Sequence, residues 1–381
     1  MEISQAIRYI GCDDTAIDLF ESQYEVPKGI SYNSYVILDE KVAVLDTADG
    51  RVTERWFENL KNALGERTPD YLIVSHLEPD HARNIELFLE KYPTAKIVGN
   101  AKTFIMFPQY FSIDISDRKI VVKEGEELAL GVHVLSFIMA PMVHWPEVMM
   151  AYEKTEKILF SADAFGKFGA LCNEEEWTDE ARRYYCNIVG KYGLSVQGVL
   201  KKAAALDIRC ICPLHGPVLQ GDLGYYLEKY NQWSSYTPEE EGTVIAYASI
   251  HGNTAQAAKT LKEILERMGK KVSLYDLARS DLAKVVAEVF RYRNLVLACS
   301  TYDGDIFSPM RDFLHRIKAK SVQKRTVGII ENGSWAPQAA RHISEALSAM
   351  KEMTVLEPIV TIRSTVKEDT LAGLNALAEK L

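Results

Sequence analysis

Several features are missing from the sequence. Its six cysteines are scattered, and no two of them form a CxxC pair. This excludes an iron–tetrathiolate module of the chain's own and, in a reducing compartment, predicts free, buried thiols. A GxxxxGK[ST] motif is also missing, which disfavours a nucleoside triphosphate as ligand.

Long apolar runs and an excess of basic residues are missing as well. No uninterrupted apolar stretch is long enough to span a bilayer, and the start MEISQAIRYI lacks the basic and apolar regions of a signal peptide. The formal net charge of −9 argues against general nucleic-acid binding. These absences predict a cytoplasmic protein without a membrane or nucleic-acid partner.

The 381 residues are too many for one ordinary core, and the two parts of the chain have different patterns. After Thr243, short β-branched runs alternate with amphipathic stretches, and the last run is TVLEPIVTI at 354–362. This alternation predicts βαβ units and a flavodoxin-like, doubly wound parallel sheet of five strands.

The first part of the chain reads as a mixed α/β region. SYNSYVIL and KVAVLDTA, joined at DE, predict a β-hairpin, and helices are expected near 53–64, 81–91 and 175–205. The polar segment SSYTPEEEG at 234–242 contains Pro and Gly and predicts the joint between the two parts. We therefore expect one domain at 1–236 and a second at 243–381.

A dense group of possible metal ligands lies in the first domain. SHLEPDH at 75–81 directly follows the apolar run YLIV, and PMVHWPE, LFSADAFG and CPLHGP each place a further histidine or aspartate after a predicted strand. Because binding sites collect on loops held by a rigid scaffold, we expect these side chains to converge. The candidate ligands are His76, Glu78, Asp80, His81, His144, Asp163 and His215.

The size of this set indicates two metal ions that share a carboxylate, because one ion takes about four to six ligands. An extended HLEPDH loop would aim His76 and Glu78 one way and Asp80 and His81 another. The alternative, in which these residues only cap or fill the fold, is weak for the whole set, because such groups repel or stay unpaired without a cation. That alternative holds for the remaining histidines considered, His133, His315 and His342.

These motifs resemble those of a known family. HLEPDH differs at Glu78 from the HxHxDH zinc motif of the metallo-β-lactamase fold. HxExDH with HWPE and DAFG, followed by a flavodoxin-like domain, is similar to the flavodiiron proteins, also called A-type flavoproteins. The resemblance covers essentially the whole chain and implies a metallo-β-lactamase-like αββα sandwich before the flavodoxin-like sheet.

The resemblance also implies roles for the candidate ligands. One iron would be bound by His76, Glu78 and His144, a second iron by Asp80, His81 and His215, and Asp163 would bridge the two. Mixed carboxylate and imidazole ligands suit iron, and the charge of Glu78 stabilises the oxidised metal. One departure is DAFGKF, which places Phe168 where many relatives carry a histidine, and this implies a difference in proton delivery or substrate preference.

The second domain carries a candidate flavin site on three loops. SIHGNT at 249–254 is a strand-to-helix turn that resembles the FMN phosphate loop of flavodoxins, and its hydroxyl and N–H groups suit a phosphate without a lysine. CSTYDGD and ENGSWAP end the third and fourth strands and flank this loop. The alternative for SIHGNT is a plain helix N-cap. The expected FMN contacts are Ser249, His251, Gly252, Asn253, Thr254, Ser300, Thr301, Tyr302, Asp303, Gly304, Asp305, Asn332, Gly333, Ser334 and Trp335.

The two sites together predict an oxidoreductase that relays electrons through FMN to a non-haem di-iron centre. The resemblance implies reduction of dioxygen to water, of nitric oxide to nitrous oxide, or both, and we favour dioxygen with nitric oxide also reduced. It further implies a head-to-tail homodimer, or a dimer of dimers. We expect no fused rubredoxin, so the electron donor would be external, such as rubredoxin or a reduced deazaflavin.

Two other functions stay open. The first is a zinc-dependent, metallo-β-lactamase-like hydrolase with an accessory flavodoxin domain. The second is an electron carrier that keeps the metal-binding fold without using it. Glu78 and the complete ligand set argue against both.

Overall fold

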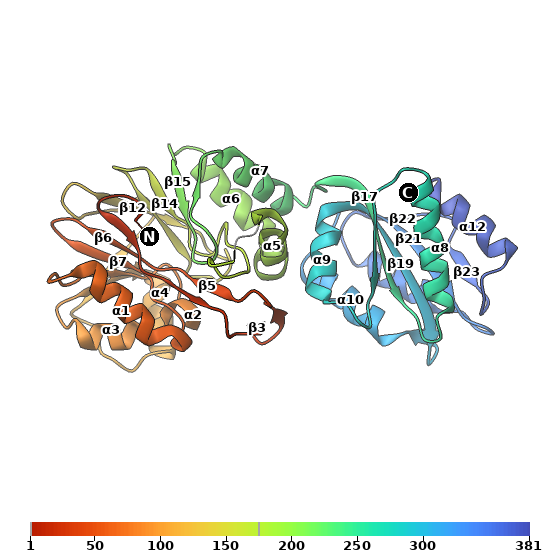
Figure 1. The fold of residues 1–381 in the computed structure, drawn as a ribbon, viewed down its shortest axis with the longest axis horizontal. Helices are drawn as coiled ribbons and strands as arrows, with labels where there is room; N and C mark the ends of the chain where they lie inside the picture. The colour runs from red at the N-terminus through yellow and green to blue at the C-terminus, as the bar shows by residue number, and fades with distance from the viewer. Residues whose placement is uncertain (1, 174–175) are drawn as a thin grey trace. The chain divides into compact units, whose positions relative to one another are not determined.

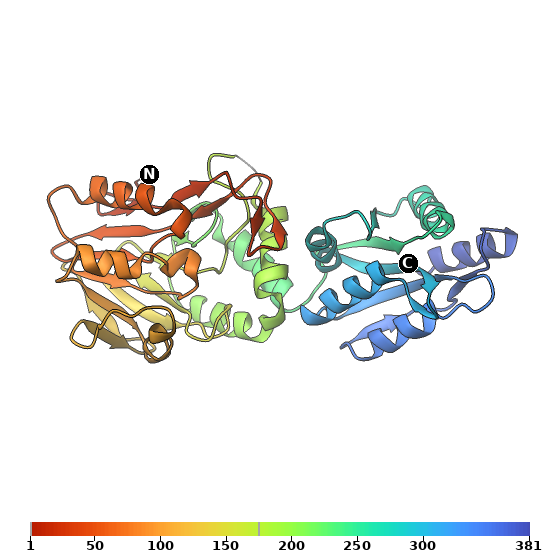
Figure 2. The ribbon, with the colours of Figure 1, turned by 90° about the horizontal axis from the view of Figure 1, so that it is seen from below.

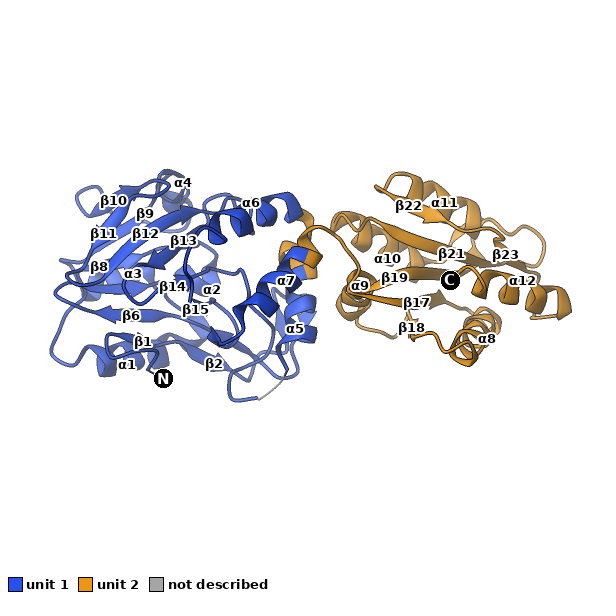
Figure 3. Cartoon of the chain, turned by 90° about the horizontal axis from the view of Figure 1, so that it is seen from above, with its two compact units in different colours: residues 1–185, 192–231 blue, residues 186–191, 232–381 orange. Residues whose placement is uncertain are grey.

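A computed structural model of the chain describes residues 2–173 and 176–381. It divides into two compact units, residues 1–185 with 192–231, and residues 186–191 with 232–381 (Figure 3). The short segment 186–191 therefore groups with the second unit although it lies within the expected first domain. The expected domain ranges themselves stay a prediction.

The first unit contains two six-stranded sheets (Figure 1). The strands of the first sheet are, in order, β1 (Ile7–Tyr9), β6 (Tyr35–Leu38), β7 (Val42–Leu45), β8 (Tyr71–Ile73), β9 (Lys96–Asn100) and β10 (Lys119–Val122). Those of the second are β11 (Glu127–Ala129), β12 (Val134–Met139), β13 (Met149–Glu153), β14 (Ile158–Phe160), β15 (Cys210–Cys212) and β16 (Leu219–Gln220). The predicted hairpin is confirmed, because β6 and β7 pair antiparallel with Leu38 opposite Val42.

The core of the first unit lies between the two sheets. Alternate residues of each strand point inward, such as Tyr35 and Ile37 on β6, and Leu135 and Phe137 on β12. All of these side chains are buried. This period-two pattern is what holds two sheets face to face.

Helices lie on the outer sides of both sheets, which gives the expected αββα layers (Figure 1), and Figure 2 looks from below onto the helices beside the first sheet. They are α1 (Thr53–Leu64), α2 (Pro79–Ala82), α3 (Ile85–Lys91), α4 (Ala101–Met106), α5 (Trp177–Tyr184), α6 (Gly193–Ala203) and α7 (Leu223–Ser234).

The helix expected near 175–205 is broken in the structure. Residue 175 lies outside the described residues. After α5 the chain forms a π-helical turn at Tyr185–Val189 and a 3-10 turn at Gly190–Tyr192, and only then begins α6. Glycines at 190 and 193 weaken a continuous helix at this point.

The second unit has the flavodoxin-like order of strands. β18 (Val272–Asp276), β17 (Glu240–Ala248), β19 (Tyr292–Tyr302), β21 (Arg325–Asn332) and β22 (Met353–Val355) pair in parallel in that order. Helices α8 (Asn253–Arg267) and α12 (Glu368–Ala378) contact each other, as do α9 (Leu282–Arg291) and α10 (Ser308–Ala319). Helix α11 (Ala339–Ser348) contacts β21.

The last strand differs from the prediction. TVLEPIVTI forms two short strands, β22 and β23 (Val360–Ile362), which both pair with β21. The break contains Pro358, which has no N–H to donate to a sheet ladder. A two-residue strand, β20 (Asp305–Ile306), adds an antiparallel pair at the end of β19. Among the residues that the structure describes, no helix is long and apolar enough to cross a membrane.

Candidate functional site

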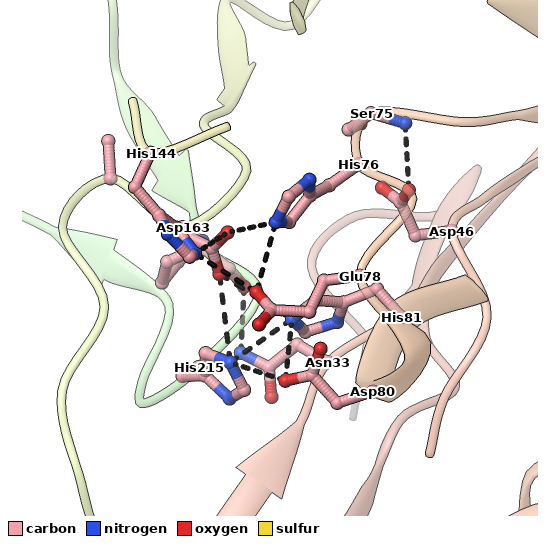
Figure 4. A network of polar contacts seen from close by, with 12 residues as sticks. Asn33, Asp46, Ser75, His76, Glu78, Asp80, His81, His144, Asp163 and His215 are labelled. Carbon is pink, nitrogen blue, oxygen red and sulfur yellow. Dashed lines mark hydrogen bonds and ion pairs between the residues drawn. The ribbon is translucent and has the colours of Figure 1, made fainter. Parts of the chain in front are cut away.

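The HLEPDH stretch combines a loop with the start of a helix. His76 follows β8, Glu78 occupies the N-cap position of α2, and Asp80 and His81 lie within this short helix. Pro79 stands at the first helical position, where a missing N–H costs nothing. The expectation of an extended loop through His81 is therefore wrong, although the four side chains still face one site (Figure 4).

The other candidate ligands follow strands of the second sheet. His144 lies between β12 and β13, Asp163 follows β14, and His215 follows β15, which runs parallel to β14. These three residues follow strands of the second sheet and the HLEPDH stretch follows β8 of the first, and all the side chains converge on one site (Figure 4). Glu78 is partly buried, and the rest are buried.

The side chains form two groups that could each hold a metal ion. The first is His76, Glu78, His144 and Asp163, and the second is Asp80, His81 and His215. Within each group the potential ligand atoms lie within 4.8 Å of one another. Apart from Asp163, which the resemblance places as a bridge and which here falls in the first group, these are the two sets that the resemblance implies for the two irons. Metal binding by them stays a prediction.

Asp163 faces both groups, with one oxygen toward each. Its Oδ2 lies 3.4 Å from His76 Nε2 and 3.6 Å from His144 Nε2. Its Oδ1 lies 3.5 Å from His81 Nε2 and 3.6 Å from His215 Nε2. This geometry suits a carboxylate that bridges two ions.

Unsatisfied polar atoms also fit a metal pair. Both carboxylate oxygens of Asp80 and Oδ2 of Asp163 are buried without a hydrogen bond. The Nε2 atoms of His81 and His215 lie 3.1 Å apart and face the same carboxylates. Cations between these groups would offset the cost of burying them. Burial alone would raise the pKa of Asp163, but the surrounding histidines outweigh it and hold this pKa well below its usual value.

Three further contacts orient the ligands, and the sequence analysis missed them. Glu147 Oε1 lies 2.8 Å from His76 Nδ1 and also accepts the Leu77 N–H. The Ser31 carbonyl oxygen lies 2.7 Å from His215 Nδ1, and Tyr184 donates its hydroxyl to Asp163 Oδ1 at 3.0 Å. Only Glu147 had a signal in the sequence, because it stands in the same HWPE motif as His144.

Phe168 belongs to an aromatic cluster beside the second group. Its ring centre lies 5.7 Å from that of Phe20 and 5.1 Å from that of Tyr184, and the Arg183 guanidinium lies 4.3 Å above it. Phe20 and Tyr184 in turn contact the His215 ring. Phe168 is buried, so this position holds an apolar packing group close to a ligand.

A cavity of about 610 Å³ lies at the carboxyl ends of the strands in the second unit. All three predicted loops line it, and only two of the expected contact residues do not, Gly252 and Asp305. Gly252 has a left-handed φ of 90° and stands at the N-cap position of α8, where its N–H binds Ser249 Oγ. Asp305 instead bonds Arg311.

The cavity also has lining residues that the sequence analysis missed, namely Ile250, Ala336, Gln338 and Ser364. Ser364 comes from a fourth loop, after β23, and Asn332 bonds its backbone at both the N–H and the carbonyl. Tyr302 and Trp335 are exposed on the cavity wall, with Trp335 89% exposed, as suits rings that cover a flat ligand. Binding of FMN by these individual residues stays a prediction.

Comparison with known proteins agrees with this architecture. Residues 30–216 match the family described as ODP family beta lactamase, and residues 245–375 match the flavodoxin family. The chain is 29% identical to a nitric oxide reductase of Moorella thermoacetica, over all of this chain and 97% of that protein.

Two solved structures share the complete fold. Rubredoxin:oxygen oxidoreductase of Desulfovibrio gigas matches with a TM-score of 0.90 and 24% identity, over 100% of this chain and 96% of that one. The flavodiiron protein of Giardia intestinalis matches with a TM-score of 0.91 and 22% identity, over 99% and 95%. The chain is a homologue of the flavodiiron proteins. This flavodiiron homologue has the predicted order of domains, and the findings favour the oxidoreductase hypothesis over the hydrolase.

Proposed function

We propose that the protein is a flavodiiron oxidoreductase that reduces dioxygen to water, nitric oxide to nitrous oxide, or both. The observation that carries this proposal is the arrangement around Asp163, whose two oxygens face two separate groups of histidines and carboxylates. The homologues named for nitric oxide and oxygen reduction support the same reaction class.

The cofactors are FMN and two non-haem irons. We assign one iron to His76, Glu78 and His144, the other to Asp80, His81 and His215, and a shared position to Asp163. FMN, when bound, supplies stepwise electron transfer, and the irons supply a redox-active site for a small oxidant. The chain orients the metal ligands through the contacts of Glu147, Ser31 and Tyr184, and burial keeps bulk water away from the ligand set.

The reaction needs electrons from outside the chain. We infer a separate donor, such as rubredoxin or a reduced deazaflavin, and a cytoplasmic location. We also infer a head-to-tail homodimer, or a dimer of such dimers, that would bring the flavin of one subunit near the irons of another. Light scattering during size-exclusion chromatography tests this, because a fully active monomer would contradict it.

Gas consumption under anaerobic conditions tests the function. The protein, loaded with iron and FMN, is reduced by rubredoxin and its reductase, and dioxygen and nitric oxide are then titrated separately with electrodes. We expect dioxygen to be consumed without peroxide, with four electrons and four protons per molecule, and nitric oxide to be consumed with one electron and one proton per molecule. Turnover of neither gas by the fully loaded protein would overturn the proposal.

The same preparation separates the zinc hydrolase from the oxidoreductase. A hydrolase would contain zinc and would act on ester or lactam substrates without any reductant. We expect no such activity, and gas consumption that stops when the reductant is withheld.

A further inference from the structure

The loop after β23 forms one wall of the cavity in the second unit. Its residue Ser364 lines this cavity together with residues from the loops 249–254, 300–304 and 332–336. β21 pairs in parallel with β19 and also with β23, so β21 lies between them. Ser364 therefore follows the carboxyl end of β23, on the side of the 332–336 loop that is away from the predicted phosphate loop at 249–254.

The backbone of Ser364 has a conformation that serine rarely adopts. Its φ is 72°, in the left-handed region, where a side chain costs free energy and glycine does not. The buried side chain of Asn332 holds it there, because Nδ2 donates to the Ser364 carbonyl at 3.0 Å and Oδ1 accepts the Ser364 N–H at 3.1 Å. Such conformations cluster at ligand sites, where the surrounding structure fixes them. A serine held in this way indicates that its hydroxyl has a use.

The Ser364 hydroxyl forms a pair with a second hydroxyl of the cavity. Its Oγ lies 2.6 Å from Ser334 Oγ, and either atom can be the donor. In both cases one O–H hydrogen of the pair is not used in this bond, and each oxygen also has lone pairs. Both residues line the cavity, Ser334 exposed and Ser364 half-buried. The pair can therefore donate to a ligand and accept from it. This suits the polar edge of an isoalloxazine ring, which carries carbonyl oxygens beside an N–H.

We propose that Ser364 is a flavin-contact residue whose hydroxyl, paired with that of Ser334, donates to a carbonyl oxygen at the polar edge of the isoalloxazine ring. Neighbouring strands of a sheet lie about 4.8 Å apart, and three such steps separate β17, which leads into the phosphate loop, from β23. The two loops are thus roughly 14 Å apart, which assigns Ser364 to the ring end of the flavin. The inference rests on the FMN site of the proposed function and is independent of the metal ligands.

A contact of this kind affects the redox potential of the flavin. The reduced ring carries more negative charge on its polar edge than the oxidised ring, so a hydrogen-bond donor there stabilises the reduced form. Hydrogen bonds to the ring are one of the means by which a protein tunes a flavin. The Ser364 hydroxyl should therefore raise the midpoint potential of the bound FMN.

A merely structural role for Ser364 makes a different prediction. In that case the affinity for FMN would follow the stability of the loop. Ser364→Ala and Ser364→Gly remove the same hydroxyl but differ in their backbone preference, because glycine adopts a positive φ more easily than alanine. We expect Ser364→Gly to unfold at a higher urea concentration than Ser364→Ala, although both lose the contact to the flavin.

The experiment uses the full-length chain, freed of metal and flavin, and titrates it with FMN and with riboflavin while the flavin fluorescence is followed. We expect both Ser364 variants to bind both flavins about 5–10-fold more weakly than the wild type, which is the loss of one typical hydrogen bond. The fold-change should be equal for the two flavins, because riboflavin has the same ring and no phosphate. Redox titration of the FMN-loaded chain should give a lower midpoint potential in both variants.

Ser348→Ala is the matched control. The Ser348 hydroxyl donates to the Glu345 carbonyl at 2.8 Å at the end of α11, and Ser348 does not line the cavity. Its loss should leave the affinity for FMN within about twofold of the wild type and the midpoint potential unchanged.

The outcomes are distinguishable. Wild-type affinity in either Ser364 variant would overturn the inference alone. A loss confined to FMN would assign Ser364 to the phosphate, and a weaker affinity with an unchanged or higher midpoint potential would rule out the donor to the ring, so both results would overturn it as well. A wild-type chain that binds neither flavin would overturn the proposed FMN site, and the inference with it. A chain that binds FMN but consumes no gas would overturn the proposed reaction and leave the inference standing.

Discussion

His76 Nδ1 lies 2.8 Å from Glu147 Oε1, while Nε2 of the same ring faces Glu78 at 3.1 Å and Asp163 at 3.4 Å. Burial would lower the pKa of His76, but the two glutamates outweigh it and raise this pKa well above its usual value. Glu147 is buried and takes the nitrogen that the metal site leaves free. It therefore fixes the direction in which His76 presents Nε2.

Removal of the Glu147 carboxylate should lower the affinity for one of the two metal ions. We expect Glu147→Gln to lower the affinity for the ion held by the His76 group by about 10-fold, because the neutral amide orients the ring less strongly. Calorimetric titration of the metal-free protein with zinc or cobalt measures this affinity. Glu153→Gln is the control, since Glu153 is also buried but bonds only backbone N–H groups. Equal affinities in the two variants would show that Glu147 does not orient His76.

The shared position of Asp163 makes its loss more severe than that of an ordinary ligand. We expect Asp163→Ala to hold at most one tightly bound metal per chain and to lose gas consumption, with FMN content unchanged, because both groups lose an oxygen. Metal analysis by mass spectrometry, together with flavin absorbance, measures this. If Asp163→Ala kept full electron-transfer function and the wild type also consumed no gas, the protein would instead be an electron carrier.

Thr254 tests the flavin cavity. Its hydroxyl bonds Ser300 Oγ at 2.8 Å in the first turn of α8, where two of the predicted loops meet. We expect Thr254→Val to weaken FMN binding by about 5–10-fold, which corresponds to the ~1 kcal/mol of a typical hydrogen bond. Quenching of FMN fluorescence during titration measures the affinity. Thr260→Val, six residues further along the same helix and outside the cavity, should bind FMN as the wild type does.

The contacts of His133 make the free energy of unfolding depend on pH. Its ring nitrogens lie 2.7 Å from Asp39 and 3.0 Å from Glu156. Burial lowers the pKa of His133, but these two carboxylates outweigh it, and the pKa is raised above its usual value. The resulting stabilisation is fully present below the unfolded value of about 6.5 and is lost as pH rises through the higher folded value.

The replacement His133→Gln should therefore destabilise the protein more at pH 6 than at pH 9. Urea denaturation of the metal-free protein at both pH values measures the difference in the free energy of unfolding between variant and wild type. An equal difference at both pH values would show that the protonated ring contributes nothing beyond its packing.

Local patterns in the sequence were enough for the parallel sheet and for the ligand types. Apolar runs predicted the hairpin of the first unit, strand–helix alternation after Thr243 predicted the parallel sheet, and the αββα sandwich was what the family resemblance implied. Because binding sites collect on loops held by a rigid scaffold, four separate motifs that each follow a strand already predicted one site. Two breaks were not predicted. Pro358 divides the last strand, and a π-helical turn and a 3-10 turn interrupt the expected helix after Tyr184.

The sequence by itself determined which residues could bind metal and flavin, because residue type and position after a strand are local properties. Only the tertiary structure decided how they are used. It directs the two oxygens of Asp163 toward the two groups of metal ligands and places the Glu147 carboxylate against His76 Nδ1. It also brings Ser364 to the cavity from a fourth loop. These relationships join residues far apart in the chain, and their distances depend on how whole sheets and helices pack, which no local pattern encodes.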